Sequence, residues 1–356
     1  MANYRRILII KPSSLGDVVH ALPVLAALRA SCPLAHIAWL VKREWAGLLE
    51  RAQGLDQIWK VDPGVAGWLA LVPRLRAARF DLVVDLQGLF RSGAMAWMTG
   101  CPNRIGFANG REGSPFFYSS RVALPIAEMH AVDRYLLVAR ALGAKASAPE
   151  FRLCPSAKDR EEVARLLARH GVRAGASWIA VNVSARWPTK RWPAEFFAAA
   201  GDQLQQEGVG PLVLVGGSNE RRESNAVITR MSTAPIDLTG ETTPGLLPAL
   251  FASATVLLTN DSGPMHIAAA VGTPVVALFG PTSPVRTGPY GAEHRVLRSD
   301  IACSPCFSRV CGNRVHLECL TTIAPGAVVD AVRQQVSSRM LKKAPNFVLG
   351  LSKPST

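Results

Sequence analysis

The stretch Val256-Leu-Leu-Thr-Asn-Asp-Ser-Gly-Pro-Met-His-Ile-Ala-Ala-Ala-Val-Gly-Thr-Pro-Val-Val-Ala-Leu-Phe-Gly-Pro-Thr-Ser-Pro284 has the order strand, turn, helix, strand, turn. Its first apolar run, 256–258, is typical of a buried parallel strand, and 260–263 supplies turn and helix-capping residues. A short helix at 265–271 ends at Gly272, and 274–279 is predicted as the next strand. Such a turn presents free backbone N–H groups at the carboxyl edge of a sheet, where α/β folds bind phosphate. We predict an anion site here; the alternative is a capped turn with a core-facing histidine.

The composition describes a globular protein. The chain has 356 residues, of which 49% are hydrophobic and 19% charged, and this length suffices for two domains. Its longest apolar run is shorter than a membrane helix, and the apolar residues at 7–10 are too few for a signal-peptide core. We therefore expect a cytoplasmic protein.

The net charge of +14 favours an anionic partner: nucleic acid, an acidic membrane surface or a phosphorylated substrate. Nucleic acid is disfavoured because the basic residues are scattered and the aromatic residues form no stacking motif. Near position 70, Arg74, Arg76 and Arg79 follow Trp68 and Leu69 in a basic amphipathic segment. Two interpretations of this segment stay open: contact with acidic lipid, and a surface helix packed on a sheet.

Four of the seven cysteines fall in one short segment with the spacing C-x2-C-x4-C-x7-C. They are Cys303, Cys306, Cys311 and Cys319. The first pair has metal-ligand spacing, but the whole segment does not match the common zinc spacings. A zinc site and a loop of free or paired thiols both remain open.

Apolar runs alternate with amphipathic segments in both halves of the chain, which predicts two α/β domains with doubly wound parallel sheets. Between 145 and 155 the periodicity is lost, and we place the domain junction there. The expected N-terminal domain is 1–155 and the expected C-terminal domain 156–323. A last helix is predicted at 324–341, followed by a loose tail at 342–356.

The first predicted strand leads into the loop Lys11-Pro-Ser-Ser-Leu-Gly-Asp17 and a helix. Asp17 at the helix entrance is either a cap or a base, and Gly16 lets a ligand approach the backbone. His20 lies on the same helix face as Asp17. Neither half contains a G-x-G-x-x-G, a P-loop or a G-x-S-x-G motif, so dinucleotide, P-loop and nucleophile-elbow sites are disfavoured.

Taken together, these motifs resemble the ADP-heptose:lipopolysaccharide heptosyltransferases, glycosyltransferase family 9, from about Arg6 to about Val336. The most specific part is 260–266 with 278–282, supported by Ala185-Arg-Trp-Pro-Thr-Lys-Arg-Trp-Pro193. Residues 11–20, 85–92 and 130–134 look most like heptosyltransferase I. The cysteine segment looks more like heptosyltransferase II.

The resemblance implies a GT-B fold, in which two facing Rossmann-like domains enclose a cleft and the last helix crosses back to the N-terminal domain. The implied reaction is inverting transfer of heptose from ADP-L-glycero-β-D-manno-heptose to the Kdo region of the lipopolysaccharide core, as in Kdo2-lipid A. It needs no cofactor and no metal. The implied location is the cytoplasm, peripheral at the inner face of the membrane, and no nucleic acid is expected as a partner.

Residue by residue, the resemblance assigns Asp17 as the general base. The expected donor-binding residues are Ser184, Lys190, Glu220, Asp261, Ser262, Gly263 and His266. The expected acceptor-side residues are Ser14, Gly16, His20, Gln87 and Arg91. Each has a structural alternative, such as a solvated surface lysine for Lys190 or a core histidine for His20.

Four rival functions stay open. Two lie within the family: heptosyltransferase II, and a transferase for another acceptor, because acceptor choice depends on variable N-terminal loops. The third is a nucleotide-sugar epimerase on the same two-domain fold, which would need a second acid/base pair. The fourth is a non-catalytic anion-binding protein, whose affinity would fall steeply with salt and ignore Asp17→Asn.

Overall fold

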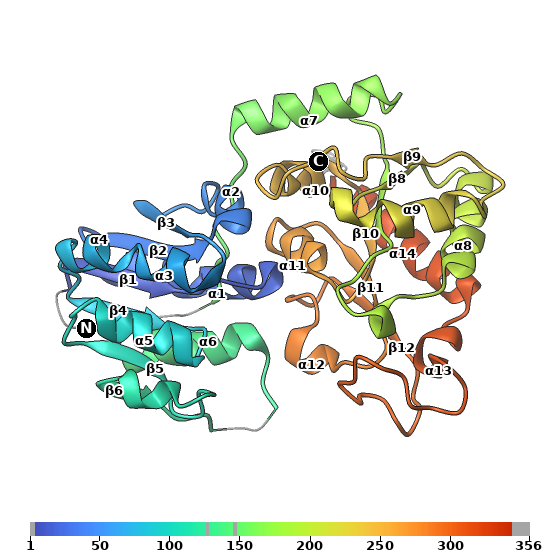
Figure 1. The fold of residues 1–356 in the computed structure, drawn as a ribbon. Helices are drawn as coiled ribbons and strands as arrows, with labels where there is room; N and C mark the ends of the chain where they lie inside the picture. Colours follow the sequence, from blue (N-terminus) through green and yellow to red (C-terminus); the bar gives the residue numbers. More distant parts are fainter. Residues whose placement is uncertain (1–3, 126–127, 145–147, 344–356) are drawn as a thin grey trace, which may run out of the picture.

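The structure is a computed structural model that describes residues 4–125, 128–144 and 148–343. Two α/β domains stand side by side, each built around one sheet (Figure 1). Within the described residues, no helix combines the length and hydrophobicity that crossing a bilayer requires.

The N-terminal sheet has six parallel strands in the order β3-β2-β1-β4-β5-β6. The chain builds outward from β1 in one direction and from β4 in the other, so the topological switch point lies between β1 and β4. The strands are β1 (Arg6–Ile10), β2 (His36–Lys42), β3 (Gln57–Val61), β4 (Leu82–Asp85), β5 (Arg104–Phe107) and β6 (Ser120–Val122).

Helices cover both faces of this sheet because successive side chains of each strand point to opposite faces. Ile7 and Ile9 of β1 pack with α1 and α6, whereas Leu8 and Ile10 pack on the face covered by α4 and α5. The helices are α1 (Leu15–Ser31), η1 (Arg43–Trp45), α2 (Ala46–Leu49), α3 (Gly64–Leu69), α4 (Val72–Ala77), α5 (Phe90–Met98), η2 (Ser114–Phe117) and α6 (Ala131–Ala141).

The C-terminal sheet repeats this topology, with the order β12-β11-β10-β7-β8-β9 and a switch point between β7 and β10. Both domains are therefore Rossmann-like, as predicted. The strands are β7 (Ile179–Asn182), β8 (Leu212–Leu214), β9 (Ile236–Asp237), β10 (Val256–Asn260), β11 (Val275–Phe279) and β12 (Arg295–Arg298).

The helices of this half include α11, which follows the turn after β10 as predicted. They are α7 (Ala157–Arg169), η3 (Pro188–Lys190), α8 (Ala194–Gln206), η4 (Ser218–Glu220), α9 (Arg221–Ile228), α10 (Leu247–Ser253), α11 (Gly263–Ala270), α12 (Pro284–Thr287), α13 (Glu318–Thr321) and α14 (Pro325–Lys343).

The last helix, α14, packs on its own domain, which corrects the expected crossing to the N-terminal domain. Its main contacts are with α8 and the strands β10, β11 and β12. The reason lies in its apolar stripe: Val328, Val329, Val332 and Val336 recur at helical spacing and are buried among residues of the C-terminal sheet. The predicted tail overlaps the end of this helix, and 344–356 lie outside the described residues.

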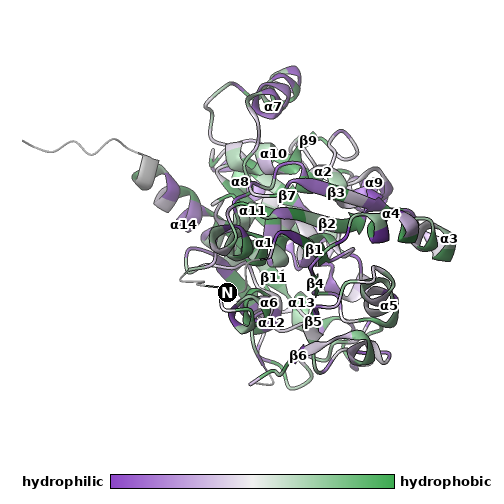
Figure 2. Ribbon diagram, turned by 90° about the vertical axis from the view of Figure 1, so that its left-hand side faces the viewer, coloured by the Kyte–Doolittle hydropathy of each residue, from purple (hydrophilic) through white to green (hydrophobic). Residues whose placement is uncertain are grey.

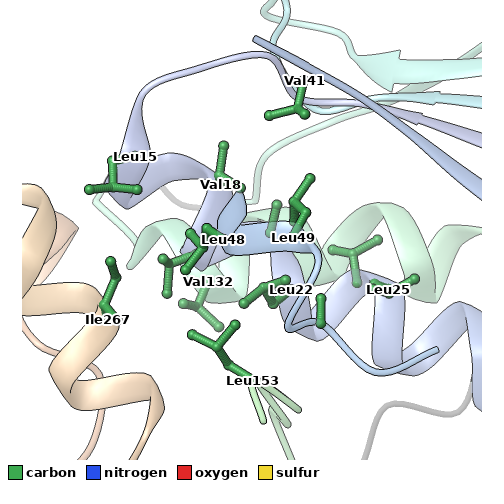
Figure 3. Close-up of a cluster of buried hydrophobic side chains, with 14 of the residues drawn as sticks. Leu15, Val18, Leu22, Leu25, Val41, Leu48, Leu49, Val132, Leu153 and Ile267 are labelled. Atoms are coloured by element: carbon green, nitrogen blue, oxygen red, sulfur yellow. The ribbon is translucent and has the colours of Figure 1, made fainter. Parts of the chain in front are cut away.

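The two domains meet through α1 and α11. Helix α1 is apolar on all sides, and Leu15, Val18, Leu22 and Leu25 are buried. Figure 3 shows these side chains with Ile267 of α11 across the boundary. A helix without a polar face must be buried on every side, and α11 of the other domain covers one side of α1.

Candidate active site at the domain boundary

Asp17 lies in the first turn of α1, just beyond the carboxyl end of β1. Ser14 is the N-cap of this helix, and its backbone N–H and Oγ both donate to Asp17 Oδ2, at 3.0 and 2.8 Å. This is a capping box, which a serine at the N-cap and an acidic residue three positions later predict. The carboxylate thus caps the helix with one oxygen and keeps the other, Oδ1, for different partners.

Lys11 and Tyr135 are the partners of Asp17 Oδ1, and the motifs above predict neither. The Lys11 Nζ lies 3.9 Å from Oδ1 and 5.0 Å from the centre of the Tyr135 ring. The Tyr135 hydroxyl donates to the same oxygen at 3.3 Å. Lys11 is only 3% exposed, although lysine is seldom buried without a partner. The one sequence feature that could have indicated a functional role for Lys11 is its position directly after a buried parallel strand.

The electrostatics of this group keep Asp17 ionised. Burial alone would raise the pKa of Asp17, but the Lys11 charge and the Ser14 hydrogen bonds outweigh it and hold this pKa below its ordinary value. Burial would lower the pKa of Lys11, yet Tyr135 and Asp17 raise it above its ordinary value. At neutral pH a carboxylate therefore stands beside a buried ammonium group.

The first turn of α11 touches the first turn of α1. A Cβ added to Gly263 would lie 2.9 Å from Leu15 Cδ2 and 3.1 Å from Leu15 Cβ, so glycine permits this approach. Two helix N-termini, and hence two positive dipole ends, converge near Asp17. This field favours a negatively charged ligand at the turn between β10 and α11.

Lys190 and Asp261 form an ion pair across the switch point of the C-terminal sheet. The Lys190 Nζ lies 2.6 Å from Asp261 Oδ2, and Thr282 Oγ1 donates to that oxygen at 2.6 Å. The ammonium group also lies 4.8 Å from the centre of the Trp187 ring. An arriving anion would therefore meet an ammonium group that is already positioned.

The remaining donor-side candidates follow neighbouring strands of the same sheet. Ser184 is buried just after β7. Glu220 ends η4 after β8, and its Oε2 accepts from the Gly217 N–H at 2.8 Å. Ser262 donates through Oγ to Asn182 Oδ1 at 2.9 Å, so its hydroxyl stabilises the turn. The structure thus brings these residues to one sheet edge with Lys190 and Asp261.

His20 and His266 join the two domains. The His20 Nε2 lies 2.9 Å from His266 Nδ1, and both rings are buried. His130 packs against His20 with ring centres 5.3 Å apart, and its Nε2 lies 3.0 Å from the Gly288 carbonyl oxygen of the other domain. Burial lowers the pKa of His266 to about 4, and burial with the His266 charge lowers that of His20. His20 thus lies in a buried interdomain contact, and its expected place on the acceptor side stays a prediction.

Gly16→Ala is expected to destabilise the domain boundary by about 1–3 kcal/mol, because overpacking has costs of this size. A Cβ on Gly16 would lie 2.3 Å from His266 Cδ2 and 2.9 Å from His266 Nε2. The free energy of unfolding in urea measures the effect. Gly326→Ala in α14 is the matched control, since a Cβ there meets nothing within 4 Å. Equal stability of the two variants would contradict this prediction.

Gln87 and Arg91 follow β4, which is the neighbour of β1 across the switch point. Among the described residues, Gln87 Oε1 is buried without a hydrogen-bond partner, which leaves an acceptor that a ligand or water can satisfy. The exposed Arg91 guanidinium lies 6.0 Å from the centre of the Trp68 ring. Both residues therefore share a sheet edge with Asp17, and their contact with an acceptor stays a prediction.

The four-cysteine segment lines a cavity of about 420 Å³. All four thiols are free. Burial, together with the neighbouring Cys303, Cys306 and Cys311, raises the pKa of Cys319 to about 11. Within the part of the chain that the structure describes, no three His, Cys, Asp or Glu side chains are arranged to hold a metal ion. The four thiols therefore surround one cavity, and the zinc site and the loop of free or paired thiols stay alternatives.

Comparisons with known proteins agree with this geometry. A family model for glycosyltransferase family 9 (heptosyltransferase) matches residues 68–316. Lipopolysaccharide heptosyltransferase 1 of Pseudomonas aeruginosa is 29% identical over 328 residues, covering 86% of this chain and 87% of that protein. Lipopolysaccharide heptosyltransferase 2 of Escherichia coli K12 is 30% identical over 308 residues, covering 82% and 88%. The solved structure of E. coli ADP-heptose lps heptosyltransferase II has a TM-score of 0.77 at 26% identity, covering 95% of this chain and 99% of that one.

This likeness, with the two parallel six-stranded sheets, confirms the expected GT-B fold. It also supports a heptosyltransferase function in lipopolysaccharide core synthesis. By sequence and by fold, the chain belongs to glycosyltransferase family 9, the heptosyltransferases.

Proposed function

We propose that the enzyme transfers L-glycero-D-manno-heptose from ADP-L-glycero-β-D-manno-heptose to the Kdo region of Kdo2-lipid A, with inversion and with Asp17 as general base. The observation that carries this proposal is the contact between the first turn of α1, which holds Asp17, and the N-terminus of α11 at the domain boundary. A base and an anion site on opposite domains suit a reaction between two bound substrates. The likeness to an ADP-heptose enzyme supports the donor.

In the proposed reaction, an acceptor hydroxyl attacks the anomeric carbon while the bond from that carbon to the diphosphate oxygen breaks. The hydroxyl proton passes to Asp17 Oδ1, the oxygen that Ser14 leaves free. The electron pair of the broken bond departs with ADP. Because its pKa is held low, Asp17 begins as the carboxylate and acts as a base of moderate strength.

The negative charge on departing ADP would be met by Lys190 and the N–H groups at the start of α11. Lys190 is now paired with Asp261, so an arriving phosphate would share that ammonium group. In this proposal Asp261 and His266 lie beside the sugar, and Glu220 holds the ribose. Neither a cofactor nor a metal takes part.

The acceptor in this proposal is an anionic lipid, so the enzyme works in the cytoplasm at the inner face of the membrane. The net charge of +14 supports this location, because acidic lipids attract basic surfaces. Transfer of the second heptose is the other candidate function. It stays a candidate because the identity to a heptosyltransferase 2, 30%, lies within a percentage point of the 29% identity to a heptosyltransferase 1.

ADP release from ADP-heptose, measured with Kdo2-lipid A and separately with the heptosylated acceptor, tests the proposal. Turnover on Kdo2-lipid A supports the first transfer, and turnover on the heptosylated acceptor alone moves the assignment to the second. If neither acceptor works while ADP-heptose binds, the acceptor assignment is wrong. If ADP-heptose fails to bind, the donor assignment is wrong as well.

Lys11→Met is expected to move the acid limb of the pH–rate profile to higher pH. Lys11 holds the pKa of Asp17 low, so wild-type activity persists until the pH falls through that low value. Without the charge this pKa rises, and activity is lost at a higher pH. The measurement is kcat/KM against pH, with Lys60→Met on the exposed side of β3 as the control. An acid limb that stays in place would argue against the role of Lys11.

A further inference from the structure

Helix α3 is an apolar helix that its own domain leaves largely exposed, with Trp68 partly buried against the core. Its sequence Gly-Val-Ala-Gly-Trp-Leu has no charged residue, and none of its residues is buried. Val65 and Leu69, one helical turn apart on the same face, are 75% and 52% exposed. The basic amphipathic segment predicted here is therefore divided. Its second half packs on the sheet through Leu71 and Leu75. In its first half Trp68 packs against the core and Leu69 is exposed.

Helix α5 and the turn η2 extend this exposed apolar surface. Phe90 and Trp97 lie seven residues apart on α5, hence on one face of the helix, and both are more than half exposed. Phe116 of η2 is 84% exposed. We call the set Val65, Leu69, Phe90, Trp97 and Phe116 the apolar surface.

Side-chain contacts connect the elements that carry the apolar surface. The Arg91 guanidinium of α5 lies over the Trp68 ring of α3, and the Phe90 ring packs edge-on against Phe117 of η2 with centres 5.3 Å apart. Helix α5 also contacts α4 and η2. Figures 1 and 2 show α3, α4 and α5 on the same side of the N-terminal domain. The five side chains thus belong to neighbouring elements on one side of the domain.

The charges beside the apolar surface are mostly positive. The residues from Gly64 to Phe80 include no acidic side chain, and Arg74 and Arg76 of α4 are exposed. Arg91 and Arg111 are exposed as well. Glu112, two residues before η2, is exposed and acidic. Its Oε2 accepts a hydrogen bond from the Phe90 N–H at 3.2 Å.

We propose that the apolar surface and its arginines dock the enzyme on an anionic lipid bilayer. Large apolar side chains rimmed by arginine are the chemistry of an interfacial membrane contact: the apolar groups enter the headgroup region and the guanidinium groups contact lipid phosphate. This inference rests on the proposed function, because a lipid-anchored acceptor requires the enzyme to approach a membrane.

The place of this surface in the fold agrees with that role. Helix α3 follows β3 and α5 follows β4, so both begin at the carboxyl edge of the sheet, the edge that carries Asp17 and Gln87. A bilayer held there would present a lipid-anchored sugar next to the acceptor side. A second copy of this chain is disfavoured as the occupant, because two arginine-rimmed faces would repel each other.

Co-sedimentation of the full chain with sugar-free vesicles tests the proposal. Wild type should bind vesicles of phosphatidylethanolamine and phosphatidylglycerol and should not bind phosphatidylcholine vesicles. Arg74→Glu with Arg76→Glu should weaken binding by at least about fivefold for each arginine. Val65→Ser with Leu69→Ser should weaken it by roughly tenfold or more.

Matched controls are available on the same chain. Leu34→Ser removes a fully exposed leucine between α1 and β2, at the amino edge of the sheet. Helix α1 covers the sheet face opposite to the one that α4 and α5 cover. Arg160→Glu with Arg165→Glu makes the same charge change on α7. Both controls should bind vesicles as wild type does. Trp97→Ser with Phe116→Ser tests the surface again if the α3 variant has a lowered Tm.

Turnover separates this inference from the proposed function. The surface variants should keep wild-type kcat/KM on a delipidated Kdo acceptor in solution and lose activity on acceptor embedded in vesicles. Vesicle binding without turnover on any acceptor would leave the docking surface standing and overturn the proposed function. Wild-type protein that ignores anionic vesicles, surface variants that bind like wild type, or a dimer that Val65→Ser with Leu69→Ser dissociates would overturn the docking surface.

Discussion

Asp17→Asn is expected to lower kcat by roughly 10²–10⁴-fold, the range that general-base catalysis contributes. Asparagine has the same shape, and its carbonyl oxygen can still accept the hydrogen bonds from Ser14. The neutral amide can no longer take the proton from the acceptor hydroxyl, so the chemical step slows. The dissociation constant for ADP, measured by calorimetry, should stay unchanged because the lost function concerns the acceptor.

Asp159→Asn is a matched control for the structural part of this change. Asp159 Oδ2 accepts from the N–H and Oγ of Ser156 at 2.8 and 2.7 Å, which is the same capping box in α7. It also pairs with Arg51, as Asp17 pairs with Lys11, so both variants remove a capping charge that is part of an ion pair. The kcat of Asp159→Asn should nevertheless match wild type. Comparable kcat losses in the two variants would mean that Asp17 acts through helix capping and not as a base.

Much of the fold could be predicted because buried parallel strands are apolar runs, and most strands of both sheets are of this kind. The edge strand β12 was not predicted: Arg295 and Arg298 at its ends are exposed, so it lacks the apolar pattern. Helix α5 was missed as well, since Ser92 and Gly93 are poor helix formers. Gly93 is needed there for packing, because a Cβ would lie 2.9 Å from the Phe117 ring.

The candidate site could be predicted only where its residues lie in one local motif. The Ser14–Asp17 capping box is local, and the sequence predicted Asp17 at the helix entrance, as a cap or a base. The burial of Lys11 and its contact with Tyr135 depend on α6, which is more than a hundred residues away along the chain. The pairing of His20 with His266 depends on how the domains pack, which no local pattern encodes.

Lys190→Ala is expected to lower kcat/KM for the donor by roughly 10²–10³-fold, the loss typical of removing one group that stabilises developing charge. The ammonium group is placed at the switch point of the C-terminal sheet, where a departing diphosphate needs positive charge. The dissociation constant for ADP should rise in parallel, because ADP carries the same diphosphate. Lys190→Arg, which keeps the charge, should lose less on both measures.

Because Lys190 is paired with Asp261, Lys190→Ala affects stability as well as ADP binding, and a second variant at Asp261 separates the two effects. Lys190→Ala leaves a carboxylate that is 6% exposed with Thr282 as its remaining donor, so the free energy of unfolding should fall by about 1–3 kcal/mol. In a protein that already carries Asp261→Asn, this loss of stability should shrink, because no buried charge is left unpaired. The loss of ADP affinity caused by Lys190→Ala should persist in that background. If it disappears instead, Lys190 serves to neutralise Asp261, and the leaving group is stabilised by other groups.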